Sequence, residues 1–414
     1  MRVSAGVPVR PRVIHVVTSA LTLPLMRGQV QYLQNSGFDV TVISSPGKWL
    51  DAVAQIEGVQ VIGVPIAREI APIQDLVSLW SLWRIMRALC PAVTNVGTPK
   101  AGLLGGFAAW LNRVPCRFYT LHGLRFETTN GLRRQLLVYA ERLACRFAHR
   151  VISVSPSVRE KAIASGLTSR ERTVVLRYGS YCGVDVSRFA PTPEMMRRAA
   201  ALRTELSIPP DAPIVGFVGR LTRDKGIPEL VEAFFRLSDR FPDLRLLLLG
   251  RFEDEDPLPA KTRSCLDLHP HVILAGVIEE PAPYYALMDI LVLPSHREGF
   301  PTAVLEAHAV GKPVVAARAT GSADAVVHGE TGLLFPVGAV AALVEAVAGL
   351  LTDKVLACKL GRAGLERVTR EFRQEQMWEA LREEYLEFLR TAGLPLPATT
   401  THKVTADLVE NSNA

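Results

Sequence analysis

The sequence predicts an α/β protein of two domains, each built on a parallel β-sheet that helices cover on both faces. Its 414 residues are 48% apolar, which is enough for two separate hydrophobic cores. Short β-branched runs alternate along the chain with longer segments of helical periodicity. This alternation stops after Phe189, at APTPEMMRRAA, and a second series opens at Ile214. Apolar strands separated by helices are typical of parallel sheets that are buried on both faces.

The first domain is expected to span residues 1–190 and the second residues 191–372, with the junction between Asp185 and Pro213. Strands of the first domain are expected at Val13–Val17, Val40–Ser44, Val93–Asn95, Arg117–Leu121 and Val151–Val154, with helices at Leu25–Asn35, Ala101–Leu111 and Leu132–His149. Those of the second are expected at Ile214–Val218, Leu244–Leu249, Val272–Leu274, Ile290–Leu293 and Val314–Ala316. Residues 373–390 should form a C-terminal helix that crosses back to the first domain, and residues 391–414 a flexible tail.

Hydropathy and cysteine usage favour a cytoplasmic protein. The longest apolar run, 101–111, is well short of the ~20 residues that cross a bilayer. The opening MRVSAGVPVRPRVIHVV has no apolar stretch with a cleavage site, so we do not expect export. The six cysteines are scattered without a C-x-x-C pair, so we expect neither a disulfide nor a structural metal.

Charge is divided unevenly along the chain. Residues 1–190 carry 23 Lys and Arg against 10 Asp and Glu, a net charge of +13, which leaves −7 for the rest. Such a basic half indicates an anionic partner, which could be a phosphate-bearing substrate, a membrane surface or nucleic acid. We do not expect nucleic acid, because the basic half lacks interleaved aromatic residues and any reader motif.

A phosphate-binding loop is predicted where the strand Ile214–Val218 ends in GRLTRDKG. Arg220 and Lys225 lie five residues apart on this loop. Gly219 and Gly226 would let backbone N–H groups approach an anion, and the N-terminus of the following helix adds partial positive charge. The alternative is a solvated surface turn, in which charged residues are ordinary.

A second group of candidate residues follows the strand Ile290–Leu293, in PSHREGFPTAVLEAHAVGKPVVA. Glu298 lies on the loop and Glu306 inside the next helix, which Thr302 is expected to cap. A loop carboxylate for sugar hydroxyls, free amides for a diphosphate and a helical carboxylate for a ribose diol together describe a nucleotide-sugar site. The alternative is a helix with two ordinary solvated glutamates.

These motifs resemble those of the retaining family 4 glycosyltransferases, which have the two-domain GT-B architecture. The resemblance rests on REGFPTAVLEAHAVGKPVVA, preceded by VGRLTRDKG and followed by GSADAVVHGETGLLFPVG. It continues in NVGTPKAGLLGGFAAWLNRVPCRFYTLHGLRFE and in the hinge GVDVSRF, and it is greatest for the bacterial branch that builds capsule, exopolysaccharide and O-antigen. The resemblance implies two Rossmann-like domains that face each other across a cleft, with the acceptor side in 1–190 and the donor side in 191–372.

The resemblance also implies roles for individual residues. Glu298 would be catalytic and contact donor-sugar hydroxyls, and Glu306 would bind the ribose of the nucleotide. His122 would reach the donor sugar from the first domain, although a lone histidine at a strand end is more often a structural hydrogen-bonder. The residues implied to bind the donor diphosphate are Arg220, Lys225, Gly299, Phe300, Pro301 and Thr302.

The implied activity is a metal-independent hexosyltransfer from a nucleotide-diphosphate sugar to a saccharide or polyprenyl-linked acceptor in surface-polysaccharide biosynthesis. A UDP-sugar is expected rather than a GDP-sugar, and retention would come from front-side attack with the leaving phosphate as base. One alternative is a GT-B sugar-nucleotide epimerase, and another is a non-catalytic scaffold subunit. The intact pairs of cations and glutamates favour the transferase.

Two departures and one further motif complete the pattern. The family hinge usually reads Asn-Gly-Val-Asp, whereas this chain has Cys182 in place of the asparagine, and residues 18–22 lack the double glycine of many relatives. Asp254 and Asp256 formally spell the D-x-D motif that binds manganese in another glycosyltransferase fold. We expect a solvated acidic turn there rather than a metal site.

A basic helix is predicted over residues 131–150. Arg142, Arg146 and Arg150 recur at four-residue spacing beside apolar positions. The plainer interpretation is a domain helix with its apolar side in the core. The alternative is a contact with an anionic membrane or with the acceptor, which would place the protein peripherally on the inner face of the plasma membrane.

Overall fold

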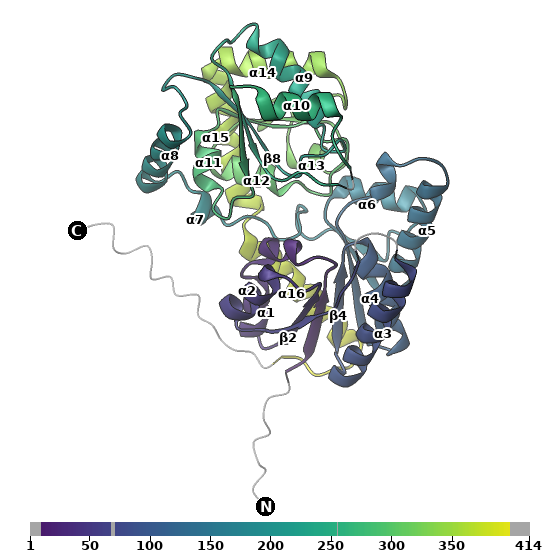
Figure 1. Cartoon of the computed structure of the whole chain (residues 1–414). Helices are drawn as coiled ribbons and strands as arrows, with labels where there is room; N and C mark the ends of the chain where they lie inside the picture. Colours follow the sequence, from purple (N-terminus) through teal and green to yellow (C-terminus); the bar gives the residue numbers. More distant parts are fainter. Residues whose placement is uncertain (1–9, 68–70, 255, 398–414) are drawn as a thin grey trace, which may run out of the picture. The chain divides into compact units, whose positions relative to one another are not determined.

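Two parallel β-sheets organise the chain in a computed structural model that describes residues 10–67, 71–254 and 256–397. Both sheets are interleaved with helices along the chain (Figure 1). Every strand pair whose register is defined is parallel. The expected α/β class with two doubly wound sheets is therefore confirmed.

The first sheet has the strand order β3-β2-β1-β4-β5-β6-β7. Its strands are β1 (Arg12–Val16), β2 (Asp39–Ser44), β3 (Gln60–Gly63), β4 (Val93–Gly97), β5 (Cys116–Leu121), β6 (Arg150–Ser153) and β7 (Thr173–Val174). The helices between them are η1 (Ala20–Met26), α1 (Gln29–Asn35), α2 (Lys48–Glu57), α3 (Pro72–Leu89), α4 (Pro99–Leu111), η2 (Arg125–Thr128), α5 (Gly131–Phe147) and α6 (Pro156–Ala164). The order reverses direction between β1 and β4, where ligands of such sheets usually bind.

The second sheet has the order β10-β9-β8-β11-β12-β13. Its strands are β8 (Ile214–Val218), β9 (Arg245–Leu249), β10 (Val272–Gly276), β11 (Ile290–Leu293), β12 (Val314–Ala317) and β13 (Gly332–Phe335). Its helices are α7 (Val186–Phe189), α8 (Pro193–Glu205), α9 (Ile227–Ser238), α10 (Ala260–Leu268), α11 (Ala282–Leu287), α12 (Thr302–Ala309), α13 (Ser322–Ala325), α14 (Val340–Thr352) and α15 (Lys354–Glu371), followed by α16 (Gln374–Thr391).

The switch point of the second sheet lies between β8 and β11. Both strands are apolar and almost wholly buried, as the sequence predicts for central parallel strands. The helix α9 buries Ile227, Leu230 and Phe234 against this sheet, a spacing of three to four residues that keeps them on one face. Because β8 and β11 are adjacent and parallel, the loops that follow them leave the sheet at the same edge.

Some predicted element boundaries are wrong. The expected helix Leu25–Asn35 begins only at Gln29. The preceding residues form the 3-10 helix η1, which contains Pro24, and Gly28 at φ 80° has a left-handed backbone that separates η1 from α1. The expected basic helix ends at Phe147, so Arg150 opens β6 and does not belong to the helix.

The chain divides into two compact units, residues 1–118 with 382–414 and residues 119–381, so far as these are described. In the first unit, Tyr385 of α16 accepts a hydrogen bond of 2.7 Å from the Asn95 amide on β4 and packs on Phe118. The domain boundaries at 190 and 372 remain predictions. From residue 398 on, the expected tail lies outside the described residues. No described helix combines the length and the apolar character needed to cross a membrane.

Candidate functional site

The loop after β8 holds the two predicted phosphate-binding cations. The Arg220 guanidinium donates to the Glu253 carboxylate at 2.9 Å and to Asp224 at 3.3 Å. Glu253 follows β9, its side chain is only 5% exposed, and it also accepts a hydrogen bond of 3.1 Å from Arg251. Arg220 is therefore fixed by a buried carboxylate that the sequence analysis did not single out.

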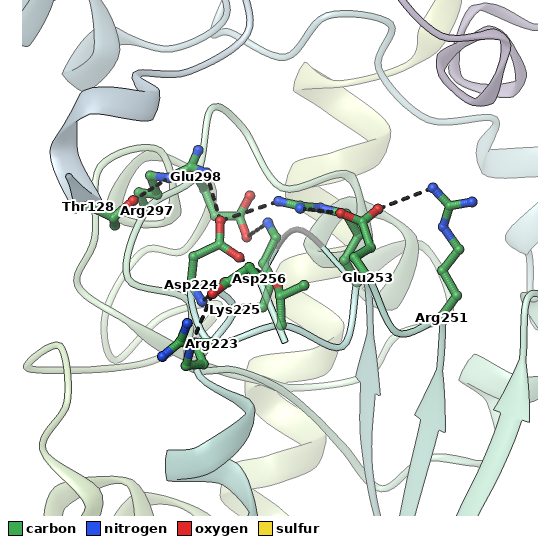
Figure 2. A network of polar contacts seen from close by, with 11 residues as sticks. Thr128, Arg223, Asp224, Lys225, Arg251, Glu253, Asp256, Arg297 and Glu298 are labelled. Atoms are coloured by element: carbon green, nitrogen blue, oxygen red, sulfur yellow. Dashed lines mark hydrogen bonds and ion pairs between the residues drawn. The ribbon is translucent and has the colours of Figure 1, made fainter. Parts of the chain in front are cut away.

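Lys225 joins this loop to the loop after β11. Its Nζ lies 2.5 Å from Oε1 of Glu298, and both side chains are largely buried. Figure 2 shows the pair inside a larger network of charged residues. The structure thus brings together two predicted site residues that lie far apart in the sequence, because their strands are neighbours in the sheet.

Asp224 and Arg297 form the centre of the network in Figure 2. Arg297 Nη2 donates to Asp224 at 2.7 Å, and its Nε donates to the Thr128 hydroxyl of η2 at 3.0 Å. Burial alone would raise the pKa of Asp224, but the Thr222 hydroxyl and the guanidinium groups of Arg297 and Arg220 outweigh it and lower that pKa. Asp224 is therefore ionised at neutral pH and holds two arginines in place.

The acidic turn after β9 is part of this network. The Asp256 carboxylate accepts hydrogen bonds from the backbone N–H of Asp224 at 2.9 Å and from Arg223 at 3.1 Å. Glu255 lies outside the described residues. Within residues 10–67, 71–254 and 256–397, no group of three or more His, Cys, Asp or Glu side chains is placed to hold a metal ion. In this structure Asp256 braces the Arg220–Lys225 loop.

Glu306 lies on α12 and is held by Tyr285 of α11. The Tyr285 hydroxyl donates to Oε2 of Glu306 at 2.6 Å, and the tyrosine itself is fully buried. Burial raises the pKa of Glu306 to about 7, although Tyr285 and Arg188 oppose this. Tyr285 is a second residue that the sequence analysis missed, because a tyrosine in an apolar helix reads as core.

The segment Gly299, Phe300, Pro301 and Thr302 forms the turn into α12. The expectation that Thr302 caps this helix is wrong: Pro301 occupies the cap position and Thr302 is the first helical residue, without a side-chain cap. Among the described residues no side chain caps the first turn, and the Val304 amide donates to the Pro301 carbonyl at 3.1 Å. At Gly299 a Cβ atom would lie 1.9 Å from the His122 carbonyl oxygen, so only glycine fits this close approach.

His122 directly follows β5 and lies in the same compact unit as Glu298. Its Nε2 atom is buried and has no hydrogen-bond partner among the described residues, while its ring packs edge-on against Tyr181 at 4.4 Å. Burial lowers the pKa of His122 to about 4, so the imidazole is neutral at pH 7. A neutral ring with an unused nitrogen can form a hydrogen bond to a sugar hydroxyl.

The three arginines of the expected basic helix lie on two elements, α5 and β6. Arg142 donates to the carbonyl of Gly166 at 2.9 Å, and Arg150 on β6 donates to that of Glu171 at 3.1 Å. Arg146 is exposed in the last turn of α5. Two of the three therefore have structural roles in this fold.

Comparison with known proteins identifies the family. The model described as "Glycosyl transferases group 1" matches residues 212–353, and "Glycosyl transferase 4-like domain" matches residues 22–179. The capsular polysaccharide biosynthesis glycosyltransferase CapM of Staphylococcus aureus is 34% identical over 383 residues, which are 92% of this chain and 98% of that protein. The chain therefore belongs to the family 4 type of glycosyltransferases. The predicted family and the prediction of a transferase enzyme are thereby confirmed.

A second relative and two solved structures also match most of the length of this glycosyltransferase. The UDP-Gal:alpha-D-GlcNAc-diphosphoundecaprenol alpha-1,3-galactosyltransferase of Escherichia coli is 26% identical, covering 81% of this chain and 87% of its own. The structure of Anabaena HepE with UDP and glucose matches with a TM-score of 0.76 at 21% identity, covering 91% of this chain and 99% of that one. The structure of WaaG, a glycosyltransferase involved in lipopolysaccharide biosynthesis, matches with a TM-score of 0.68 at 14% identity, covering 89% of this chain and 98% of that one. These structures confirm the GT-B fold, and among the relatives named here none is an epimerase.

Proposed function

We propose that this glycosyltransferase moves a hexosyl unit from a nucleotide-diphosphate sugar to a saccharide or lipid-linked acceptor, with retention of configuration. The observation that carries the proposal is the ion pair between Lys225 and Glu298, with Arg220 on the same loop. It joins the predicted diphosphate-binding loop to the predicted sugar-binding loop at one edge of the sheet. The capsule-building relative and the lipid-linked galactosyltransferase support the class of reaction.

The charges of these loops suit a departing diphosphate. As the bond between the anomeric carbon and the phosphate oxygen breaks, negative charge grows on that oxygen, and preorganised cations stabilise it. Arg220 and Lys225 would supply this charge, and the N-terminus of α12 would add partial positive charge to it. The acceptor hydroxyl would attack from the same face and pass its proton to the leaving phosphate, which preserves the configuration of the sugar.

Lys225 already has an anion beside it in this structure, namely the Glu298 carboxylate. A donor phosphate would compete for the same ammonium group. When it does, Glu298 is released toward the sugar hydroxyls, which are the partners proposed for it. Recognition of the diphosphate would thus prepare recognition of the sugar.

The remaining site residues fit the other parts of the donor. Glu306, fixed by Tyr285, would accept hydrogen bonds from the ribose diol. His122 would contact a donor-sugar hydroxyl through its free nitrogen. The E. coli galactosyltransferase, which is named for UDP-Gal, and the HepE complexes with UDP and UDP-glucose favour UDP over GDP as the nucleotide. We place the enzyme at the cytoplasmic face of the plasma membrane, where lipid-linked acceptors are available.

The proposal is tested in two steps. A thermal-shift screen with UDP, GDP and their sugars should show stabilisation by UDP and UDP-sugars, because a ligand that binds only the native state raises its stability. NMR of the product formed from the stabilising α-linked donor should then show an α-linked hexose on the acceptor. An inverted linkage would contradict retention, and conversion of the donor to its epimer without transfer would support the epimerase instead.

A further inference from the structure

The helix α3 has two separate apolar faces. One face is buried in its unit through Ser78, Leu82 and Met86, spaced four residues apart. A helix advances about 100° per residue, so positions 73, 76, 77 and 80 lie on the opposite side. These positions hold large apolar side chains with exposures of 82% for Ile73, 67% for Leu76, 56% for Val77 and 55% for Trp80.

A helix that packs on a sheet normally carries one apolar stripe and turns a polar side to solvent. On α3 (Figure 1) the solvent side is apolar over two consecutive turns. Contiguous exposed apolar surface of this kind marks a site of interaction with another molecule or with lipid. Packing within the fold accounts only for the buried face.

Two arginines extend the exposed side of α3 toward its C-terminal end. Arg84 and Arg87 are exposed and follow Trp80 by one and two turns. The Arg84 guanidinium lies 4.6 Å from the Trp80 ring centroid, and that of Arg87 lies 5.7 Å from the Trp83 ring. We call Ile73, Leu76, Val77, Trp80, Arg84 and Arg87 the outer face of α3.

The acidic residue of α3 is turned away from this face. Asp75 forms an ion pair of 2.6 Å with Lys100 of α4, and both side chains are largely buried. The outer face therefore presents aliphatic groups, tryptophan and arginine without a carboxylate of its own helix. This composition is complementary to an anionic lipid surface, where tryptophan sits at the headgroup level and arginine pairs with phosphate.

We propose that the outer face of α3 docks this glycosyltransferase on an anionic lipid bilayer. The proposal deepens the proposed function and rests on it in one respect: a lipid-linked acceptor gives the enzyme a reason to lie at a membrane. It also moves the membrane contact from Arg142 and Arg150, which hydrogen-bond to backbone carbonyls, to a helix whose outer side chains are exposed. The lipid-facing stripe runs lengthwise along one helix, so α3 would lie parallel to the membrane plane.

The test measures co-sedimentation of the full chain with vesicles of phosphatidylglycerol and phosphatidylcholine. We expect binding that increases with phosphatidylglycerol and weakens with salt, since charge attraction is screened. The variant Ile73→Gln/Leu76→Gln/Trp80→Gln should bind at least about tenfold more weakly, because it removes the apolar area that would be buried in the bilayer. Arg84→Gln/Arg87→Gln should lose the preference for phosphatidylglycerol.

A matched control removes the same number of exposed apolar side chains from another helix. Leu132, Leu136 and Tyr139 on α5 are exposed by 83%, 51% and 58%, and their triple change to Gln should leave vesicle binding close to wild type. Thermal unfolding and UDP calorimetry verify that each variant is folded. Failure of UDP binding in the wild-type chain would count against the proposed function alone, since vesicle binding is measured without nucleotide.

Three results would overturn the proposal. One is the absence of wild-type binding to phosphatidylglycerol vesicles even at low salt. Another is equal binding by the α3 triple variant and the wild type, or equal loss in the α3 and α5 variants. The third is a wild-type dimer in light scattering that the α3 variant converts to a monomer while vesicle binding is unchanged, which would make this face an interface between copies of the chain.

Discussion

Single residues of the donor loops are held by partners of opposite charge before any ligand arrives. Arg220 is oriented by Glu253, so its guanidinium does not need to be ordered when a diphosphate binds, whereas Lys225 must first exchange Glu298 for a phosphate oxygen. Preorganisation of this kind lowers the entropic cost of binding.

We therefore predict that Arg220→Ala and Lys225→Ala each weaken UDP binding by about 1.5–3 kcal/mol, the contribution of a hydrogen bond to a charged group. Isothermal calorimetry measures the change. Arg236→Ala is the matched control, because this arginine pairs with Glu232 on exposed α9 surface away from the loop. Unchanged affinity for both UDP and GDP in the two loop variants would remove these residues from the donor site.

Tyr285 offers a second prediction at this scale. Tyr285→Phe removes the hydroxyl that orients Glu306, so UDP affinity should fall by about 0.5–1.5 kcal/mol, while 2′-deoxy-UDP, which lacks part of the diol, should be affected less.

The raised pKa of Glu306, about 7, gives this residue a pH signature. Only the ionised carboxylate accepts two hydroxyl hydrogen bonds, so affinity should decrease as the pH falls from 8 to 6. Glu306→Gln should flatten that part of the profile, and the titration of the phosphate itself is common to both proteins. If UDP affinity depends on pH identically in the wild type and in Glu306→Gln, Glu306 does not bind the ribose.

Elements of the fold are joined by polar contacts as well as by apolar packing. The Tyr119 hydroxyl on β5 donates to the Glu141 carboxylate on α5, and both side chains are buried. Burial raises the pKa of Glu141 to about 7, against the effects of Tyr119 and Arg125.

Tyr119→Phe should lower the free energy of unfolding by about 1–3 kcal/mol, because it leaves a buried carboxylate without its donor. Urea unfolding followed by circular dichroism measures the loss. Tyr139→Phe on the exposed side of α5 is the control and should change little. A destabilisation no greater than that of the control would mean that the Tyr119 hydrogen bond contributes nothing to this packing.

How far the sequence predicts these elements depends on their burial. The central strands β1, β4, β8 and β11 were predictable because buried parallel strands are apolar runs. The edge strand β3 was not, since its side chains are half exposed, and α3 was not, because apolar residues on two faces hide the helical period.

The site divides in the same way. Arg220, Lys225, Glu298 and Glu306 stand in local motifs that a sequence displays. Glu253 and Tyr285 act through contacts 33 and 21 residues away in the chain, which only the folded structure reveals.

At the scale of the whole molecule, the charge balance differs between the halves, yet Arg220, Lys225, Glu298 and Glu306 of the proposed donor site lie in the half with a net charge of −7. The cations of the site are thus a local feature, offset by Asp224, Glu253 and Glu298. This arrangement leads to a prediction about metal ions.

Turnover should persist in EDTA, because Arg220, Lys225 and the first turn of α12 provide the positive charge that a metal ion would otherwise supply. The measurement is the initial rate of hexosyl transfer with EDTA and with added magnesium or manganese. A strict, reversible manganese requirement would contradict the prediction and make Asp254 and Asp256 the next residues to change.

In the proposed mechanism Lys225 exchanges Glu298 for the donor diphosphate and thereby frees Glu298 for the sugar. Calorimetric titration of Glu298→Gln with UDP tests this exchange. We expect UDP to bind this variant at least as tightly as the wild type, since the competing carboxylate is gone, while hexosyl transfer is lost. UDP binding weakened as strongly as in Lys225→Ala would contradict it, because Glu298 would then support the diphosphate site and not compete for it.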